Sequence, residues 1–587
     1  MDRLTRRGFL GKATTLGAAA ILSPTLLHCA RGGMPLPQGQ RPNILLVITD
    51  DQGFGDFGCY GNEVLNTPHL DRLHAESTRL ERFYACPLCT PTRASLMTGR
   101  YNYRTGAWDT WKGRASLSSD EVTIAEILAA NGYRTGIFGK WHLGYSAPTR
   151  PQDQGFQETY TWDGVSKGRV DPPIEHNGVL EERQGFITDL IFDQCMSWME
   201  ENEDGPFFAY LATFLPHDIV GVSVPEEYVA PFRDVEGLTP GDQVIYGMIA
   251  KIDENMGRLL QFLEQSGRFR DTIVIFMSDN GPTRLTEDLT SEPERIASQK
   301  TEIGARFNRG LRGGKATLYE GGIRIPFWIR LPGESAAGRE IDAPTAHIDV
   351  LPTLLDLCSV KPAADNPPID GRSFAPLLQG TGDWPDRCLF IQNHRVEAPE
   401  PGVEYCVVGR QYKLIENDFG LQLYDLHADP GETTNIAGEH PEVVEQMRDA
   451  YRKWYADVTS GRGFYPALTA LGDPTQPLID FPWYTRHSVG WPVRIQRQGP
   501  YTVSVKGIHH AIFKGETAFE LKLGDITLNR VVDPGADTLV FEGLTPTLGE
   551  STFDLKAAGP IEEKEIFYGA NDPGFDHVTI EYVGPPR

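Results

Sequence analysis

Short, continuous apolar runs in the first 330 residues predict buried β-strands. One of them is Asn43–Thr49, and the others lie at 134–138, 207–213, 272–277 and 325–329. Runs of this kind are typical of strands that are buried on both faces, as in a parallel sheet. Helical periodicity appears between them, at 123–131 and at 245–265. The alternation predicts an α/β fold with a mixed, largely parallel sheet sandwiched by helices.

The pattern changes twice towards the C-terminus. Short polar strands and one helix, Pro441–Val458, occupy 380–465 and predict a smaller α+β subdomain. Beyond 466, apolar and polar residues alternate in short segments separated by Gly, Pro and Asp, at 501–505, 519–523, 526–528, 538–541 and 578–582. Such half-buried strands predict an additional C-terminal β-sandwich over 466–587. The main α/β domain is then expected over 42–379.

Residues 1–31 differ from the rest of the chain and predict an export signal. The pair Arg6-Arg7 precedes Phe9-Leu10 and an apolar stretch from 13 to 27, a pattern like that of a twin-arginine signal. The stretch is short for a membrane span, although an anchor that stays attached is an alternative. Lipid anchoring at Cys29 is a second alternative, against which the bulky His28 argues. We expect an exported protein, periplasmic, cell-surface or extracellular, with no transmembrane segment in the mature chain.

Composition narrows the function. A net charge of −25 over 587 residues excludes a nucleic-acid backbone as a partner. An acidic protein that binds an anionic substrate must gather positive charge locally, so the positions of Lys and Arg are informative. The eight cysteines are scattered and lack the spacing of a zinc site. Cys86 and Cys89 form the one Cys-x-x-Cys pair, for which a redox dithiol remains an alternative.

Acidic pairs follow two of the predicted strands. Asp50-Asp51 comes after the first strand, and Asp279-Asn280 after the strand at 272–277. Ligands bind at the carboxyl ends of strands in open α/β sheets, and clustered oxygen donors suit a hard divalent cation. The alternative is a pair of ordinary turns at strand ends.

A cysteine precedes a predicted helix start at Cys89-Thr90-Pro91-Thr92-Arg93. Pro91 fits the first helical turn, and a helix N-terminus attracts anions through its unpaired amides and dipole. The alternatives are a buried structural cysteine or a disulfide partner for Cys86.

This segment, followed by Leu96-Met97-Thr98-Gly99-Arg100, resembles the signature of type I sulfatases of the alkaline phosphatase superfamily, whose cysteine is oxidised to formylglycine. Other blocks resemble the family in the right order between 42 and 437. They are Asp50-Asp51-Gln52-Gly53, Gly139-Lys140-Trp141-His142-Leu143-Gly144, Pro216-His217, Ser278-Asp279-Asn280-Gly281, Gly313-Gly314-Lys315, and the segments 319–326, 347–355 and 423–430.

The resemblance implies the parts of an active site. Its cofactors are formylglycine formed from Cys89 and one calcium ion, and the implied calcium ligands are Asp50, Asp51, Cys89, Asp279 and Asn280. The hydrated aldehyde attacks sulfur in line. Five side chains are expected around the sulfate and the nucleophile: Arg93, Lys140, His142, His217 and Lys315. The implied roles are that His217 and Lys315 assist the departing alcohol oxygen and that His142 takes the proton from the second hydroxyl.

The resemblance also implies the partners. They are a sulfated glycan or small sulfate ester, and a formylglycine-generating or anaerobic sulfatase-maturating enzyme. We expect a sulfatase that acts on a sulfated carbohydrate. Substrate specificity is expected from the loops at 101–114, 145–179 and 282–312, whose aromatic and basic residues suit sugar rings and anionic groups. These residues are Trp108, Trp111, Trp162, Lys167 and Arg169.

Two departures and two alternatives remain. Thr92 stands where Ser or Ala is usual, and His217-Asp218-Ile219 lacks a second proline often found in this block.

A phosphodiesterase or phosphonate monoester hydrolase of the same superfamily uses the same nucleophile, although Gly313-Gly314-Lys315 favours sulfate. An inactive glycan-binding protein on a sulfatase scaffold is the other alternative, and the retention of every expected catalytic position argues against it.

Overall fold

The computed structural model describes residues 41–583 apart from 111–113, 145–146, 163–168, 203–204, 218–223, 284–305, 335–337, 383, 397–398, 465–468, 472–477, 483–490, 507, 509–516 and 558–576. The predicted export signal, with Cys29, lies outside these residues. Within them, no helix is long and apolar enough to cross a membrane.

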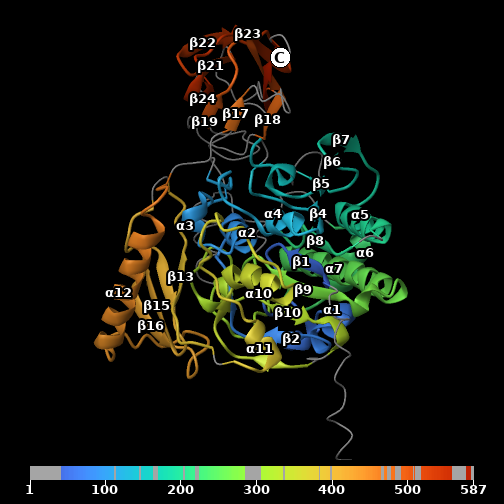
Figure 1. Cartoon of the computed structure of the whole chain (residues 1–587), viewed down its shortest axis with the longest axis vertical. Coiled ribbons are helices and arrows are strands. Elements are labelled where there is room, and N and C mark those ends of the chain that lie inside the picture. Colours follow the sequence, from blue (N-terminus) through green and yellow to red (C-terminus); the bar gives the residue numbers. More distant parts are fainter. Residues whose placement is uncertain are drawn as a thin grey trace, which may run out of the picture.

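A ten-stranded sheet organises the larger part of the chain (Figure 1). Its strands are, from one edge to the other, β11 (Glu340–Ile341), β2 (Thr78–Leu80), β10 (Phe327–Arg330), β9 (Thr272–Ser278), β1 (Asn43–Thr49), β8 (Phe207–Ala212), β4 (Arg134–Gly139), β5 (Glu158–Thr161), β6 (Pro173–His176) and β7 (Val179–Glu182). In the middle, β9, β1, β8, β4 and β5 run parallel. Strand β10 is antiparallel to β9, and β6 and β7 extend the other edge antiparallel. The predicted mixed, largely parallel sheet is confirmed.

Helices cover both faces of the sheet because alternate side chains of its strands point to opposite sides. Leu45 and Val47 of β1 pack with residues of α1 (Pro68–Ala75), α5 (Ile187–Glu201) and α7 (Pro240–Gln265). Ile44, Leu46 and Ile48 pack on the other face with α2 (Cys89–Thr98), α4 (Ile124–Ala130) and α10 (Val350–Leu357). The central strands are therefore apolar throughout, as their sequences predicted.

Short elements complete this part of the chain. The helices are α3 (Asn102–Thr105), α6 (Glu226–Val229), α9 (Glu320–Ile323) and α11 (Ala375–Gln379), and β3 (Phe83–Tyr84) pairs with β12 (Thr345–Ala346). The 3-10 turns are η2 (Gly58–Tyr60), η3 (Pro151–Gln154), η4 (Ala230–Phe232), η5 (Arg268–Arg270), η6 (Pro332–Glu334) and η7 (His347–Asp349).

A second, antiparallel sheet lies beside α12 (Pro441–Val458) (Figure 1). Its strands are β13 (Leu389–Gln392), β14 (Tyr405–Val408), β15 (Tyr412–Asn417) and β16 (Gly420–Asp425). Tyr405 of β14 stacks on Tyr451 of α12 with ring centroids 3.6 Å apart. The predicted smaller α+β subdomain is thus present, and its helix has the predicted bounds.

The C-terminal region forms two further sheets, at the top of Figure 1. One contains β17 (Thr469–Leu471), β19 (Trp491–Ile495), β24 (Gly549–Ala557), β21 (Ala518–Leu523) and β22 (Ile526–Val531). The other contains β18 (Leu478–Pro482), β25 (His577–Tyr582), β20 (Tyr501–Lys506) and β23 (Thr538–Leu544). Val503 and Phe541 of the second sheet share one apolar core with Leu521 and Phe553 of the first. This is the additional β-sandwich that the alternating pattern predicted.

Candidate active site

Four oxygen-bearing side chains meet where β1 and β9 end. The two strands pair in register up to Thr49 and Ser278, so Asp50 and Asp51 lie beside Asp279 and Asn280. The backbone N–H of Asp51, whose φ is 66°, donates to Oδ1 of Asp279 at 3.1 Å. The amide of Asn280 donates to Oδ1 of Asp51 at 2.7 Å. The four residues are buried.

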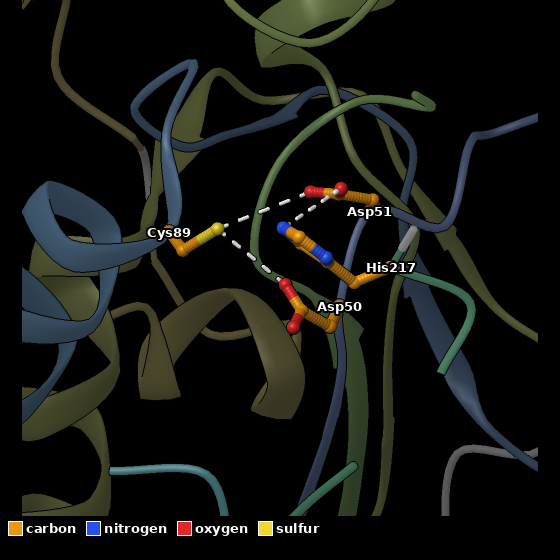
Figure 2. Close-up of side chains that lie close together, drawn as sticks. All are labelled: Asp50, Asp51, Cys89 and His217. Carbon is orange, nitrogen blue, oxygen red and sulfur yellow. Dashed lines mark hydrogen bonds and ion pairs between the residues drawn. The ribbon is translucent and has the colours of Figure 1, made fainter. Parts of the chain in front are cut away.

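Cys89 is the first residue of α2 and points into this cluster (Figure 2). Its thiol sulfur lies 3.4 Å from Oδ1 of Asp50 and 3.9 Å from Oδ1 of Asp51. Leu88, the N-cap residue of α2, is extended and makes no side-chain hydrogen bond to the first N–H groups of the helix, so its side chain satisfies none of them. Cys86 and Cys89 are free cysteines, so the disulfide alternative is wrong for this pair. Burial and Asp279 raise the pKa of the Cys89 thiol well above its ordinary value.

Three cations balance the carboxylates. Nζ of Lys140 lies 2.7 Å from Oδ2 of Asp50, and Nζ of Lys315 lies 2.7 Å from Oδ2 of Asp51. Arg93, on α2, is 0% exposed and contacts Oδ2 of Asp279 through its Nη2 at 2.9 Å. A buried charge is tolerated only when it is paired, and each of these charges has its partner across the cluster.

Two histidines border the cluster and are neutral at ordinary pH. Nε2 of His217 lies 3.7 Å from Oδ2 of Asp51, and its side chain is 31% exposed. Burial and Lys315 lower the pKa of His217 to about 4. Nε2 of His142 lies 3.3 Å from the carbonyl oxygen of Thr110, and its buried Nδ1 has no hydrogen-bond partner among the described residues. Burial and Lys140 lower the pKa of His142 well below its ordinary value, so this imidazole can accept a proton.

The donor set of the cluster fits a hard divalent cation. Ligand atoms of four residues lie within 4.8 Å of one another: Asp50, Asp51, Cys89 and His217. Oδ1 of Asn280 is buried, has no hydrogen-bond partner in the part of the chain that the structure describes, and is available to a metal ion. Burial and the charge of Asp50 raise the pKa of Asp279 to about 7, a penalty that a cation would remove. His217 is one of the four residues whose ligand atoms lie close together, and Asp279 is not. The carboxylate oxygens of Asp279 instead accept hydrogen bonds from Arg93 and from the backbone N–H of Asp51.

The structure brings together every residue that was expected to be catalytic or to bind the metal ion, but it does not support all the residues expected to bind sugar. Trp108 is 2% exposed and Trp162 is 3% exposed, so neither offers a free ring face. Arg169 is buried too and donates to the carbonyl oxygen of His217. These three residues therefore pack against or position other groups. Their burial was not predicted because residues in loops follow no periodic pattern. Trp111, Lys167, Asp218 and Ile219 lie outside the described residues.

One contact of the site was missed from the sequence. Nη1 of Arg93 lies 3.3 Å from the hydroxyl of Tyr210 and 3.2 Å from the carbonyl oxygen of Lys140. Tyr210 is a buried residue of β8, where its sequence predicts only a strand, so no sequence signal pointed to this contact.

Family models match two stretches of the chain. The sulfatase model matches residues 42–360, which is more than half of the chain, and the model of the C-terminal part of N-sulphoglucosamine sulphohydrolase matches residues 313–456. The first stretch contains every residue of the site described above.

Curated relatives and solved structures agree with the models. Human arylsulfatase A is 31% identical over 525 residues, covering 78% of this chain and 96% of the relative. An N-acetylgalactosamine-6-O-sulfatase from Bacteroides thetaiotaomicron is 28% identical and covers 70% and 92%, respectively. The solved structure of Ps i-CgsB in complex with k-i-k-neocarrahexaose superposes with a TM-score of 0.64 at 26% identity, covering 72% of this chain and 95% of that chain. With a sulfatase model over more than half of its length and these relatives over most of it, the chain belongs to the sulfatase family and is a sulfuric ester hydrolase.

Proposed function

We propose that this enzyme hydrolyses a sulfate ester on a sulfated carbohydrate, with a formylglycine formed from Cys89 and one calcium ion. The observation that carries the proposal is the position of Cys89 at the start of α2, 3.4 Å from Asp50 and enclosed by Arg93, Lys140 and Lys315. The carbohydrate assignment is supported by the relatives named for N-acetylgalactosamine 6-sulfate and by the structure solved with a neocarrahexaose.

Burial makes the thiol as translated a poor nucleophile. The pKa of Cys89 is raised by burial and by Asp279, so the reactive thiolate is disfavoured. After oxidation, a hydrated formylglycine at this position would supply the hydroxyl that attacks sulfur, and calcium would stabilise its negative charge. The ligands proposed for calcium are Asp50, Asp51, residue 89, Asp279 and Asn280, and His217 borders the same space.

Three cations bind and orient the sulfate group. Arg93, Lys140 and Lys315 converge on the space in front of Cys89, and the N-terminal amides of α2 add positive potential. Their charges are fixed before the reaction, so they stabilise the charge that spreads over the transferring sulfuryl group without reorganisation.

The histidines and Lys315 handle protons. Burial alone would lower the pKa of Lys315, but Asp51 raises it above its ordinary value, so this side chain stays protonated and can donate to the departing alcohol oxygen. His217 is neutral and can offer one N–H to the same oxygen. His142, also neutral, is the proton acceptor for the second hydroxyl of residue 89.

The remaining assignments concern maturation and location. A formylglycine-generating or anaerobic sulfatase-maturating enzyme would act on Cys89 before α2 is buried, since the residue is inaccessible in the folded chain. Export to the periplasm or the cell surface is proposed from the twin-arginine pattern at residues 1–31. The β-sandwich beyond 466 is proposed as an accessory domain, because it contains none of the site residues.

The phosphodiesterase alternative is not favoured. The curated relatives reported above are named as sulfatases, and the phosphonate monoester hydrolase of Agrobacterium radiobacter shares only the fold, at 20% identity and a TM-score of 0.50. The inactive glycan-binding alternative is opposed by membership among sulfuric ester hydrolases.

A substrate panel tests the proposal. Enzyme produced with a maturating enzyme is assayed on sulfated N-acetylgalactosamine saccharides, on carrageenan oligosaccharides, and on aryl sulfate and aryl phosphate esters. We expect kcat/KM on at least one sulfated saccharide to exceed that on the phosphate ester by at least about 100-fold. A preference for phosphate, or hydrolysis that persists in a Cys89→Ala control, would overturn it.

A further inference from the structure

A buried ion pair lies behind the two loops that carry the proposed calcium ligands. The side chains of Asp56 and Arg306 are both 0% exposed, and the guanidinium of Arg306 donates to both carboxylate oxygens, with 2.9 Å from Nε to Oδ1. Neither residue touches the space in front of Cys89. Their ion pair therefore needs an explanation other than sulfate binding.

Each partner of the pair also holds one of the ligand-bearing loops. Oδ2 of Asp56 accepts a hydrogen bond from the backbone N–H of Gly53 at 2.6 Å, two residues after Asp51. Nη1 of Arg306 donates to the carbonyl oxygen of Thr283 at 2.6 Å, three residues after Asn280. The pair thus joins the loop after β1 to the loop after β9.

Close packing makes this connection stiff. A Cβ atom on Gly53 would lie 2.8 Å from Cβ of Pro282, and one on Gly55 would lie 2.3 Å from the carbonyl oxygen of Phe307. The backbone at Gly53 therefore lies directly against the Pro282 ring, and the backbone at Gly55 lies directly against that of Phe307. A change in the position of Asp56 or Arg306 would be transmitted to both loops.

Calcium binding needs such a connection. Asp50, Asp51 and Asp279 carry like charges that repel one another across the two loops, although Lys140, Lys315 and Arg93 offset part of this repulsion. Two hydrogen bonds that cross between the loops use ligand groups themselves: Asp279 accepts from the Asp51 amide, and Asn280 donates to the Asp51 carboxylate. The Asp56–Arg306 pair uses no ligand atom, so the pair remains intact when the ligands turn to a metal ion. The same is true of the hydrogen bond from the backbone N–H of Gln52 to the hydroxyl of Ser278.

We propose that Asp56 and Arg306 are positioning residues for the calcium site. Their ion pair holds the loops after β1 and β9 at the distance that calcium binding requires, before the ion binds. When the ligands are already in position, less of the free energy of calcium binding is lost to ordering them. This inference rests on the proposed calcium site.

Two variants test it by calcium affinity. Arg306→Lys keeps the charge but loses the two-pronged contact with Asp56 and the bond to Thr283. The double variant Asp56→Leu/Arg306→Met replaces the pair by apolar side chains, which buried ion pairs often tolerate without loss of stability. Calcium dissociation constants are measured by titration calorimetry on purified, chelator-stripped protein. We expect both variants to bind calcium about 10- to 100-fold more weakly than the wild type, as is usual when the supports of metal ligands are removed.

A matched control separates positioning from general stability. Arg387 also donates to both oxygens of a buried carboxylate, that of Asp349, through Nη1 and Nη2, in a segment that carries no proposed calcium ligand. Arg387→Lys and Asp349→Leu/Arg387→Met should leave the calcium dissociation constant within about threefold of wild type.

The outcomes distinguish the two proposals. If the wild type does not bind about one calcium ion per chain, the proposed calcium site is wrong, and the positioning role is wrong as well. If the wild type binds calcium and a folded Arg306→Lys or double variant binds it equally well, the positioning role is overturned while the calcium site stands. A double variant that fails to fold leaves Arg306→Lys to decide between these results.

Discussion

The α/β part of the chain and the C-terminal β-sandwich differ in where their charged side chains lie. At the ends of β1 and β9, Asp50, Asp279 and Arg93 are buried and converge on Cys89. In the β-sandwich, the pairs Arg494–Glu550 and Lys556–Glu520 lie on the surface, where each contributes little. Buried charges are costly, and they also occur as pairs elsewhere, such as Lys413 with Glu320. The convergence of several of them on one cysteine, rather than burial alone, therefore marks the region of chemistry.

Removing the nucleophile should have the largest effect. Cys89→Ala should reduce turnover of an aryl sulfate at least ~1000-fold, because the covalent step is lost. The circular dichroism spectrum and melting temperature should stay close to wild type, since the thiol makes only weak contacts with Asp50 and Asp51. A variant within tenfold of wild-type activity would refute the assignment. Cys89→Ser should also be inactive unless the host converts serine.

Removing the metal should come next. Purified protein should contain about one calcium per chain, and stripping with a chelator should abolish activity until calcium is restored. The physical reason is that Asp50, Asp51 and Asp279 repel one another without a cation, and burial with Asp50 already raises the pKa of Asp279 to about 7. Elemental analysis of the purified protein is the measurement, and stoichiometric zinc in place of calcium would contradict the site.

Lys315→Ala should lower kcat/KM by about 100- to 1000-fold, as does the loss of one fixed charge at a developing anion. Part of the effect comes from Asp51, which would lose a partner 2.7 Å away. Steady-state kinetics on an aryl sulfate and on an ester with a better leaving group provide the test. The loss should shrink with the better leaving group if Lys315 donates to the departing oxygen, and an equal loss on both would argue against that role. The exposed Lys453 on α12, changed to Ala, is the control.

His217 should make stability depend on pH. Its pKa is lowered to about 4 by burial and Lys315, whereas in the unfolded chain it is about 6.5. Between these values the unfolded state binds more protons, so this group favours unfolding progressively as pH falls from about 6.5 to 4. His217→Gln should therefore flatten the fall of the melting temperature over this range in calcium-containing buffer. An unchanged pH dependence would show that His217 is not held neutral by its surroundings.

Removing the β-sandwich should have the smallest effect on the chemistry. A chain ending after Phe464 keeps the contacts of Arg462 with Ser118 and of Phe464 with Trp108. Its kcat/KM on a small aryl sulfate should stay within about threefold of the full-length enzyme, because no charge of the site lies beyond this point. Folded, formylglycine-bearing truncated protein with no activity would show that the sandwich completes the active site.

The sequence predicted the central strands well because a strand buried on both faces has a simple apolar pattern. Strands β1, β4, β8 and β9 lie where such runs occur, and α7 begins only five residues before the predicted 245. Edge strands such as β6 and β7 were missed, since they are short and partly exposed and their apolar residues follow no clear period.

The candidate site divides in the same way. Cys89 and Arg93 were predicted from one motif. Asp50 and Asp279 were predicted because each follows an apolar strand, and the carboxyl ends of parallel strands meet at one edge of a sheet. The contact between Asp56 and Arg306 joins positions 250 residues apart and carries no motif, so only the folded chain reveals it. The burial of Trp108 and Trp162 was missed for a similar reason, because each packs against an aromatic ring from a distant segment.

The most direct test of the account is the chemical identity of residue 89 in active enzyme. Protein purified after expression with a maturating enzyme is digested, and the peptide that contains residue 89 is analysed by mass spectrometry, with its abundance compared with specific activity across preparations. The account predicts an aldehyde in place of the thiol, in a fraction that rises in proportion to activity. Full sulfatase activity in a preparation in which the Cys89 thiol is intact throughout would contradict it.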